Sequence, residues 1–90
     1  MPPDETNAEA AATLALGALG WVLADSERAR RFLDITGITP DDLRARAGTP
    51  AFLAAMIGFL ENHEPDLIAC AEALEAAPED LTRARRVLEQ

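Results

Sequence analysis

The chain has 90 residues and a formal net charge of −8, which arises from 16 acidic and 8 basic residues. A chain of this length corresponds to one domain with a single modest hydrophobic core. The negative charge disfavours nucleic acids and anionic membranes as partners, because both carry charge of the same sign. It permits a basic partner but does not imply one, since a solvated acidic surface is the commoner cause of such a charge.

The sequence also favours a cytoplasmic location. The single cysteine, Cys70, has no partner for an internal disulfide, which indicates a reducing compartment. The first ten residues contain acids and prolines and lack the basic segment and apolar run of a signal peptide. The apolar runs are shorter than the roughly 20 residues that span a bilayer. We therefore expect a cytoplasmic protein that binds no membrane.

The first helix is expected to begin near Asn7 and to end near Leu23. Frequent alanine, the absence of tyrosine and few β-branched residues favour helix throughout the chain. Thr6 and Glu9 form a T-x-x-E capping box, a pattern in which two side chains satisfy free backbone N–H groups at a helix start. Residues 1–6 are therefore predicted to form a disordered tail.

A second helix is expected at residues 27–36. Asp25 or Ser26 caps its start, and Gly37 follows its end, where a left-handed backbone favours glycine. Its apolar residues are expected to face the core and its arginines to face water. The predicted buried stripe consists of Ala29, Phe32, Leu33 and Thr36. The arginines predicted to be exposed are Arg28, Arg30 and Arg31.

Two threonine–proline pairs, Thr39-Pro40 and Thr49-Pro50, indicate the next two helix starts. Each pair places a capping threonine before a proline at the first helical position. They predict a short helix at Pro40–Ala47 and a further helix that ends near Glu61-Asn62. The stretch Ala51–Leu60 of this further helix has no charged side chain on any side. A helix that is apolar all round must be surrounded by other helices.

Proline also indicates the starts of the last two helices, which are predicted at Asp66–Ala76 after Pro65 and at Glu79–Glu89 after Pro78. Both are expected to be amphipathic. The residues predicted to face the core are Leu67, Ile68, Ala71 and Leu74 in the first, and Leu81, Ala84, Val87 and Leu88 in the second.

The two halves of the chain resemble each other at an offset of 38 residues (58 − 20). This shift aligns Gly20 with Gly58, and Pro40–Leu43 with Pro78–Leu81. Duplication of a three-helix unit explains the match, and so does convergence, because helix starts attract the same residue types. Each helical glycine costs about 1 kcal/mol of helix propensity. We therefore expect another helix to approach closely at Gly17, Gly20 and Gly58.

The predicted fold is an all-α, compact bundle of five to six short helices, with residues 7–90 forming a single domain. The first and fourth helices are expected to form its centre, with the other four around them. Residues 38–60 imitate a helix-turn-helix. A recognition helix must present polar and basic side chains to DNA, and Ala51–Leu60 has none. An ordinary pair of packed helices is therefore favoured over DNA binding.

The sequence contains no recognisable catalytic, cofactor or metal site. His63 is the one imidazole, and with Cys70 it does not supply the three or four ligands of a zinc site. We expect His63 in the loop after the fourth helix and Cys70 in the core. The acidic pairs, such as Asp41-Asp42, lie at predicted helix starts, where the helix dipole explains them. We predict no enzyme activity and no cofactor.

Nearly the whole chain after the N-terminal tail, and residues 19–69 in particular, resembles a family of small, uncharacterised helical proteins, a domain of unknown function found mainly in alphaproteobacteria. The resemblance implies no activity, cofactor or catalytic residue, and it leads us to expect a complete protein rather than a fragment. The matching positions are Leu19, Trp21, Phe32-Leu33, Thr36-Gly37, Pro40, Leu43-Arg44, Ala47, Pro50–Leu53, Phe59-Leu60, Glu64 and Leu67.

The leading expectation is a cytosolic protein-interaction module that binds a protein partner or a second copy of itself. The first and fourth helices offer more apolar surface than short neighbours cover, which predicts a residual groove or dimer patch near Trp21. The candidate interaction surface comprises Trp21, Leu14, Arg44 and Arg46. Two alternatives remain: a helix-turn-helix-derived regulator with weak or lost DNA binding, and a carrier with a small apolar-ligand pocket between the first and fourth helices.

Overall fold

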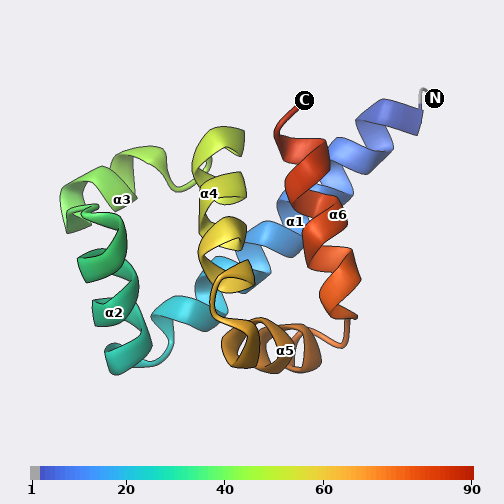
Figure 1. The fold of residues 1–90 in the computed structure, drawn as a ribbon. Helices are drawn as coiled ribbons and strands as arrows, with labels where there is room; N and C mark the ends of the chain where they lie inside the picture. The colour runs from blue at the N-terminus through green and yellow to red at the C-terminus, as the bar shows by residue number, and fades with distance from the viewer. Residues whose placement is uncertain (1–2) are drawn as a thin grey trace.

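Six helices account for the part of the chain that the computed structural model describes, residues 3–90 (Figure 1). The described residues contain no strand, which confirms the predicted all-α bundle. The helices are α1 (Pro3–Leu23), α2 (Ser26–Thr36), α3 (Pro40–Arg46), α4 (Pro50–Glu61), α5 (Glu64–Ala73) and α6 (Pro78–Leu88).

Most helix ends agree with the sequence. The bounds of α2, α3, α4 and α6 lie within one residue of the prediction. Asp25 caps α2 by accepting a backbone N–H at 3.0 Å, and Thr49 caps α4 in the same way at 3.3 Å. Thr39 and Asp42 cap each other's backbone at the start of α3. Gly37 ends α2 in the left-handed conformation, with φ of 73°. These ends are set by local chemistry, which a sequence displays directly.

The start of α1 differs from the prediction. The helix begins at Pro3, about one turn before Asn7, so the Thr6–Glu9 capping box falls inside it. Proline favours the first turn because its missing N–H has no helical acceptor there. Residues 3–6 of the predicted tail therefore belong to α1, whereas residues 1–2 lie outside the described part of the chain.

The end of α5 also differs, because the helix stops at Ala73 instead of Ala76. The chain turns there through Glu75, which adopts a left-handed φ of 57°. The N–H of Ala76 donates to the carbonyl of Ala71 at 2.8 Å, and the N–H of Glu75 donates to that of Glu72 at 3.1 Å. These two bonds form a Schellman motif, which normally has glycine at the left-handed position. Glu75 occupies that left-handed position in this chain, so the sequence has no glycine that would indicate the end of α5.

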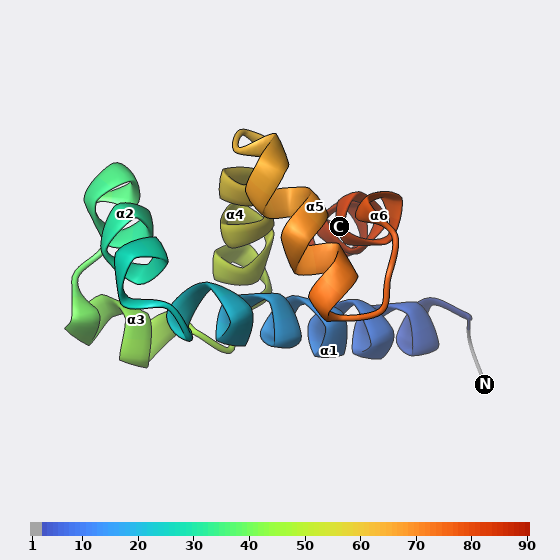
Figure 2. The same cartoon turned by 90° about the horizontal axis from the view of Figure 1, so that it is seen from below.

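The core is built around α4. This helix contributes seven buried residues, namely Phe52, Leu53, Ala54, Met56, Ile57, Phe59 and Leu60. The predicted central pair of α1 and α4 has a third member, because α6 packs extensively against both (Figures 1 and 2). It does so through the apolar stripe Leu81, Ala84 and Leu88. In contrast, α3 has no buried residue and lies at the edge of the molecule.

The side of α1 that packs against the core consists mainly of small residues, Ala11, Ala15, Ala18 and Val22. Small side chains let neighbouring helices approach closely. The prediction placed this close approach at the glycines, which is correct for Gly17 alone. A Cβ atom at Gly17 would lie 3.2 Å from the Leu74 side chain. A Cβ atom at Gly20 or Gly58 would meet no atom within 4 Å, so the prediction is wrong at those two positions.

Three predictions about which side chains are buried are also wrong. Ile68 is 47% exposed. The inward side of α5 is occupied by Cys70 and Ala71, so the Ile68 side chain points outward. Thr36 is exposed, and its hydroxyl donates to the carbonyl of Phe32 at 2.6 Å, so it needs no partner in the core. Arg28 is largely covered rather than exposed, for a reason given below. Within residues 7–90, no single helix combines the length and the apolarity needed to cross a membrane.

Candidate interaction surface

The outward side of α1 is exposed and apolar. It is formed by Thr13, Leu16, Gly20 and Leu23, together with Ala24 directly after the helix, and we call it the outer face of α1. Leu16 is 48% and Leu23 is 38% exposed. Figure 2 shows why: α4, α5 and α6 all lie on one side of α1 and leave the opposite side uncovered. Leu16 and Leu23 therefore point to water, while Ala15, Ala18, Leu19 and Val22 of the same part of α1 are buried in the core.

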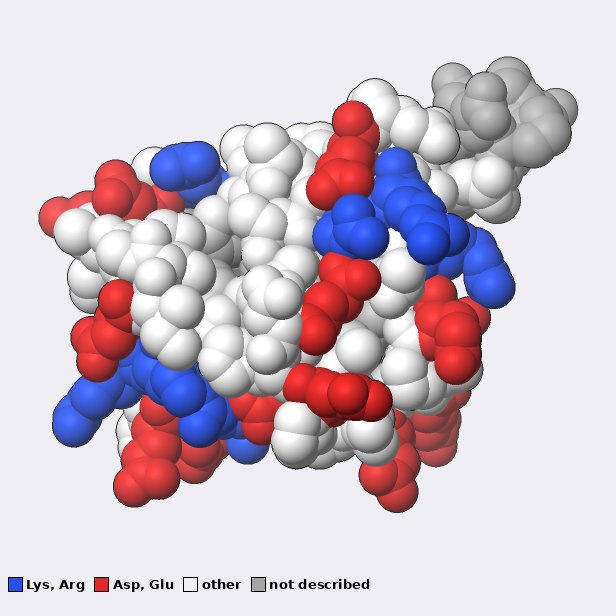
Figure 3. Space-filling model, in the orientation of Figure 1, with Lys and Arg blue, Asp and Glu red and all other residues white. Residues whose placement is uncertain are grey.

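The outer face of α1 lies in a stretch without charge. Residues 10–24 contain no charged side chain, although the chain as a whole has a net charge of −8. Elsewhere charged side chains are frequent. In the view of Figure 3, acidic side chains and arginines lie next to each other over α2, α3 and α6, whereas α5 carries acidic side chains and no arginine. A partner that docks on α1 buries apolar area without removing a charged group from water.

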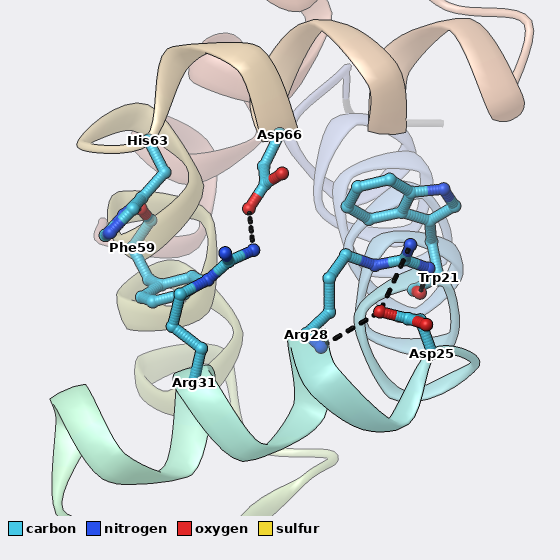
Figure 4. Close-up of polar contacts among 7 residues, drawn as sticks. All are labelled: Trp21, Asp25, Arg28, Arg31, Phe59, His63 and Asp66. Atoms are coloured by element: carbon cyan, nitrogen blue, oxygen red, sulfur yellow. Dashed lines mark hydrogen bonds and ion pairs between the residues drawn. The ribbon is translucent and has the colours of Figure 1, made fainter.

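Trp21 lies next to this face but is covered by Arg28 (Figure 4). The carbon at the centre of the Arg28 guanidinium is 3.7 Å from the centroid of the indole ring. Arg28 also donates a hydrogen bond to the carbonyl of Trp21 and forms an ion pair with Asp25 at 3.9 Å. Arginine stacked on tryptophan gains a cation–π attraction. Arg28 is therefore not a solvated residue, and Trp21 is held by α2 rather than presented as a free anchor.

Two further contacts in Figure 4 fix α5 and the loop before it. Arg31 on α2 pairs with Asp66 on α5 at 2.7 Å. The His63 ring stacks on Phe59, with ring centroids 4.6 Å apart. The Nδ1 atom of His63 lies 2.9 Å from the Phe59 carbonyl, which can only accept, so Nδ1 carries the proton. His63 thus lies in the α4–α5 loop, as predicted, and anchors that loop.

Cys70 is fully buried, as predicted. Burial raises the pKa of its thiol from 9.0 to about 11, because a thiolate in the core would lose its hydration. The reactive form of cysteine is the thiolate, and it is scarce at neutral pH for this residue. Among residues 7–90, whose side chains the structure describes, no three His, Cys, Asp or Glu side chains come together as a candidate metal site.

The structure does not bring the four predicted interaction residues together. Trp21 packs under Arg28, as described above. Leu14 lines an open groove of about 350 Å³ between α1 and α6, together with apolar residues such as Ala84 and Val87. Arg44 and Arg46 are exposed on α3, and Arg44 pairs with Asp41 at 3.3 Å. The groove lies between α1 and α6, and not between the first and fourth helices where an apolar pocket was predicted.

The exposed leucines, Leu16 and Leu23, were not predicted from the sequence. One signal was present: Ala11, Ala15 and Ala18 recur at the spacing of a single helix side. If the side of α1 that carries these alanines packs against the core, then Leu16 and Leu23 lie on the opposite side and point to water.

Six helices, with a core built around α4 and an uncharged outer face on α1, define a small all-α domain. The chain belongs to the family described as "Protein of unknown function (DUF3572)", which matches residues 8–90. No curated protein and no solved structure matches the chain. The family assignment confirms the resemblance found in the sequence, and it adds no activity or site.

Proposed function

We propose that this protein is a non-catalytic protein-interaction module that binds its partner through the outer face of α1. One observation carries the proposal: Leu16 and Leu23 are 48% and 38% exposed on a helix side that has no charged residue. Full burial of a leucine is worth about 1.5–3 kcal/mol. Since both leucines are only partly covered in the single chain, a docked partner gains a substantial fraction of that free energy at each.

Charge supports this face over the others. A partner on the acidic side of α5 would have to desolvate carboxylates such as Glu64 and Glu72, and desolvation of an uncompensated charge is costly. The helix-turn-helix alternative gains no support from α4, whose exposed positions include Ala51 and Ala55 and no basic residue. Protein recognition through α1 is therefore the function that agrees best with the distribution of apolar and charged side chains.

Affinity capture from native lysate tests the proposal. The full chain is immobilised as the wild type, as Leu16→Glu and as Ile35→Glu, and bound proteins are identified by mass spectrometry. Ile35 is the matched control, because it is 57% exposed and receives the same charge on another helix. We expect Leu16→Glu to lose proteins that Ile35→Glu retains. Identical sets of proteins on the two variants would refute the use of α1.

The groove between α1 and α6 supports a second candidate, carriage of a small apolar ligand. Its apolar lining includes Ala10, Leu14 and Val87, and its volume of about 350 Å³ is at the small end of ligand pockets. Titration with an environment-sensitive apolar dye tests this function. Saturable binding that Leu14→Trp abolishes would support it, because the larger side chain fills the groove. Dye binding that is unchanged in Leu14→Trp would exclude the groove.

A further inference from the structure

Gly20 has no packing role within the described chain. It lies in the interior of α1, where glycine is disfavoured relative to alanine, and a Cβ atom there would meet nothing within 4 Å. Two other glycines have a reason in the structure. Gly17 makes room for the Leu74 side chain, and Gly37 has a left-handed backbone. The missing side chain at Gly20 instead leaves a notch on an exposed surface.

The notch lies between two protruding side chains of the outer face of α1. Leu16 precedes Gly20 by four residues and Leu23 follows it by three, so all three residues share one side of the helix. Such a face is complementary to itself. A two-fold axis beside Gly20 brings two backbones together at the notch, and it sets Leu16 of one copy beside Leu23 of the second copy.

Charge directs a second copy to this face rather than to the others. Each copy has a net charge of −8, so two copies repel each other wherever acidic surfaces meet. Residues 10–24 allow contact without placing carboxylates opposite each other. The orientation follows from Glu9, which is exposed at the end of this stretch. Parallel helices would place the two Glu9 side chains together, whereas antiparallel helices separate them.

We propose that the outer face of α1 is a homodimer interface, in which the two α1 helices run antiparallel and cross at Gly20. The inference rests on the proposed function, because it names the partner of the same face. Because α1 ends at Leu23, two helices that cross at Gly20 lie side by side only over about seven residues, 17–23, a length of about 10 Å at 1.5 Å per residue. One helix pair of this length buries less than the roughly 800 Å² per partner of a standard interface, so the dimer belongs to the weak, transient class.

Sedimentation equilibrium from micromolar to about millimolar concentration tests the dimer. We expect the average mass to rise from 9.6 kDa toward twice that value. Gly20→Leu fills the notch and is expected to weaken association at least tenfold. Its thermal stability should equal or exceed that of the wild type, because leucine favours helix and has room there. Lost association with a more stable fold separates interface damage from unfolding.

Disulfide trapping tests the orientation. Leu16→Cys and Leu23→Cys are mixed under mild oxidation and compared with each variant alone. Antiparallel helices predict more cross-linked dimer in the mixture than in either sample alone. The native Cys70 does not interfere, since it is fully buried. More cross-linking of Leu16→Cys with itself than in the mixture would overturn the antiparallel orientation.

The dimer and the proposed function fail in different ways. A chain that stays monomeric at about millimolar concentration overturns the dimer, and so does an association that both Gly20→Leu and Leu16→Glu leave intact. The proposed function survives such a result if the lysate capture still depends on Leu16, because a different protein then occupies the face. It fails if the captured proteins are indifferent to Leu16.

Discussion

Replacing Arg28 with alanine is expected to destabilise the fold by about 2 kcal/mol. The cation–π contact with Trp21 is partly shielded from water and contributes about 1 kcal/mol. The hydrogen bond from the charged guanidinium to the Trp21 carbonyl contributes roughly 1.5 kcal/mol. A buried Nε atom that has no hydrogen-bond partner offsets part of this sum. The same carbonyl lies in the last turn of α1, so the substitution also leaves that helix end without its cation.

Urea unfolding followed by tryptophan fluorescence is a direct assay, because Trp21 is the single tryptophan and lies at the perturbed contact. Circular dichroism provides a second probe that does not depend on the indole. In thermal unfolding, the loss corresponds to about 8–16 °C for a domain of this size. Arg30→Ala is the matched control, since Arg30 is exposed on the same helix and should change stability by less than about 0.5 kcal/mol. Equal effects of the two substitutions would refute the structural role of Arg28.

Three further predictions concern stability. Glu75→Gly should raise the free energy of unfolding by about 1 kcal/mol in urea titrations, because it relieves the left-handed φ of 57°; a loss of stability would contradict the Schellman turn. Gly20→Ala should stabilise the monomer by up to about 1 kcal/mol more than Gly17→Ala, whose methyl group would press on Leu74. Stability should fall as the pH rises above 9, because the Cys70 thiol has its ordinary pKa of 9.0 in the unfolded chain and a pKa of about 11 in the folded one. Cys70→Ala should remove that part of the pH dependence. If the free energy of unfolding of this variant still falls above pH 9 as in the wild type, the role of the Cys70 thiol is contradicted.

The parts of the fold that the sequence predicted well are those decided by neighbouring residues. Thr39, Thr49 and Asp25 cap helices as expected, because a cap needs only a side-chain oxygen two or three residues before a free N–H. The burial of α4 was equally clear, since a helix without a polar side has no favourable contact with water. The position of Cys70 in the core followed from its residue type, because a free cysteine packs as a small apolar side chain.

The sequence could not decide features that depend on which helix packs against which side. The apolar residues of α1 surround the whole helix, so the period alone could not show that Leu16 faces water and Ala15 the core. Arg28 was assigned to solvent because its cover, Trp21, lies on another helix. The interaction surface predicted from residue type therefore divides into separate places, with Leu14 in a groove and Arg44 on α3.

The peripheral position of α3 has a consequence for the order in which the molecule opens. α2 contributes one buried residue, Phe32, whose ring packs edge-on against Phe52 and Phe59 of α4 at 6.2 and 5.1 Å. α3 contributes none. The segment from Ser26 to Arg46 is thus held to the core by one fully buried ring, by partly buried side chains such as Leu33 and Leu43, and by the contacts of Arg28 and Arg31. It should behave as a separate foldon, whose amides exchange with deuterium while those of α4 stay protected until the whole chain unfolds.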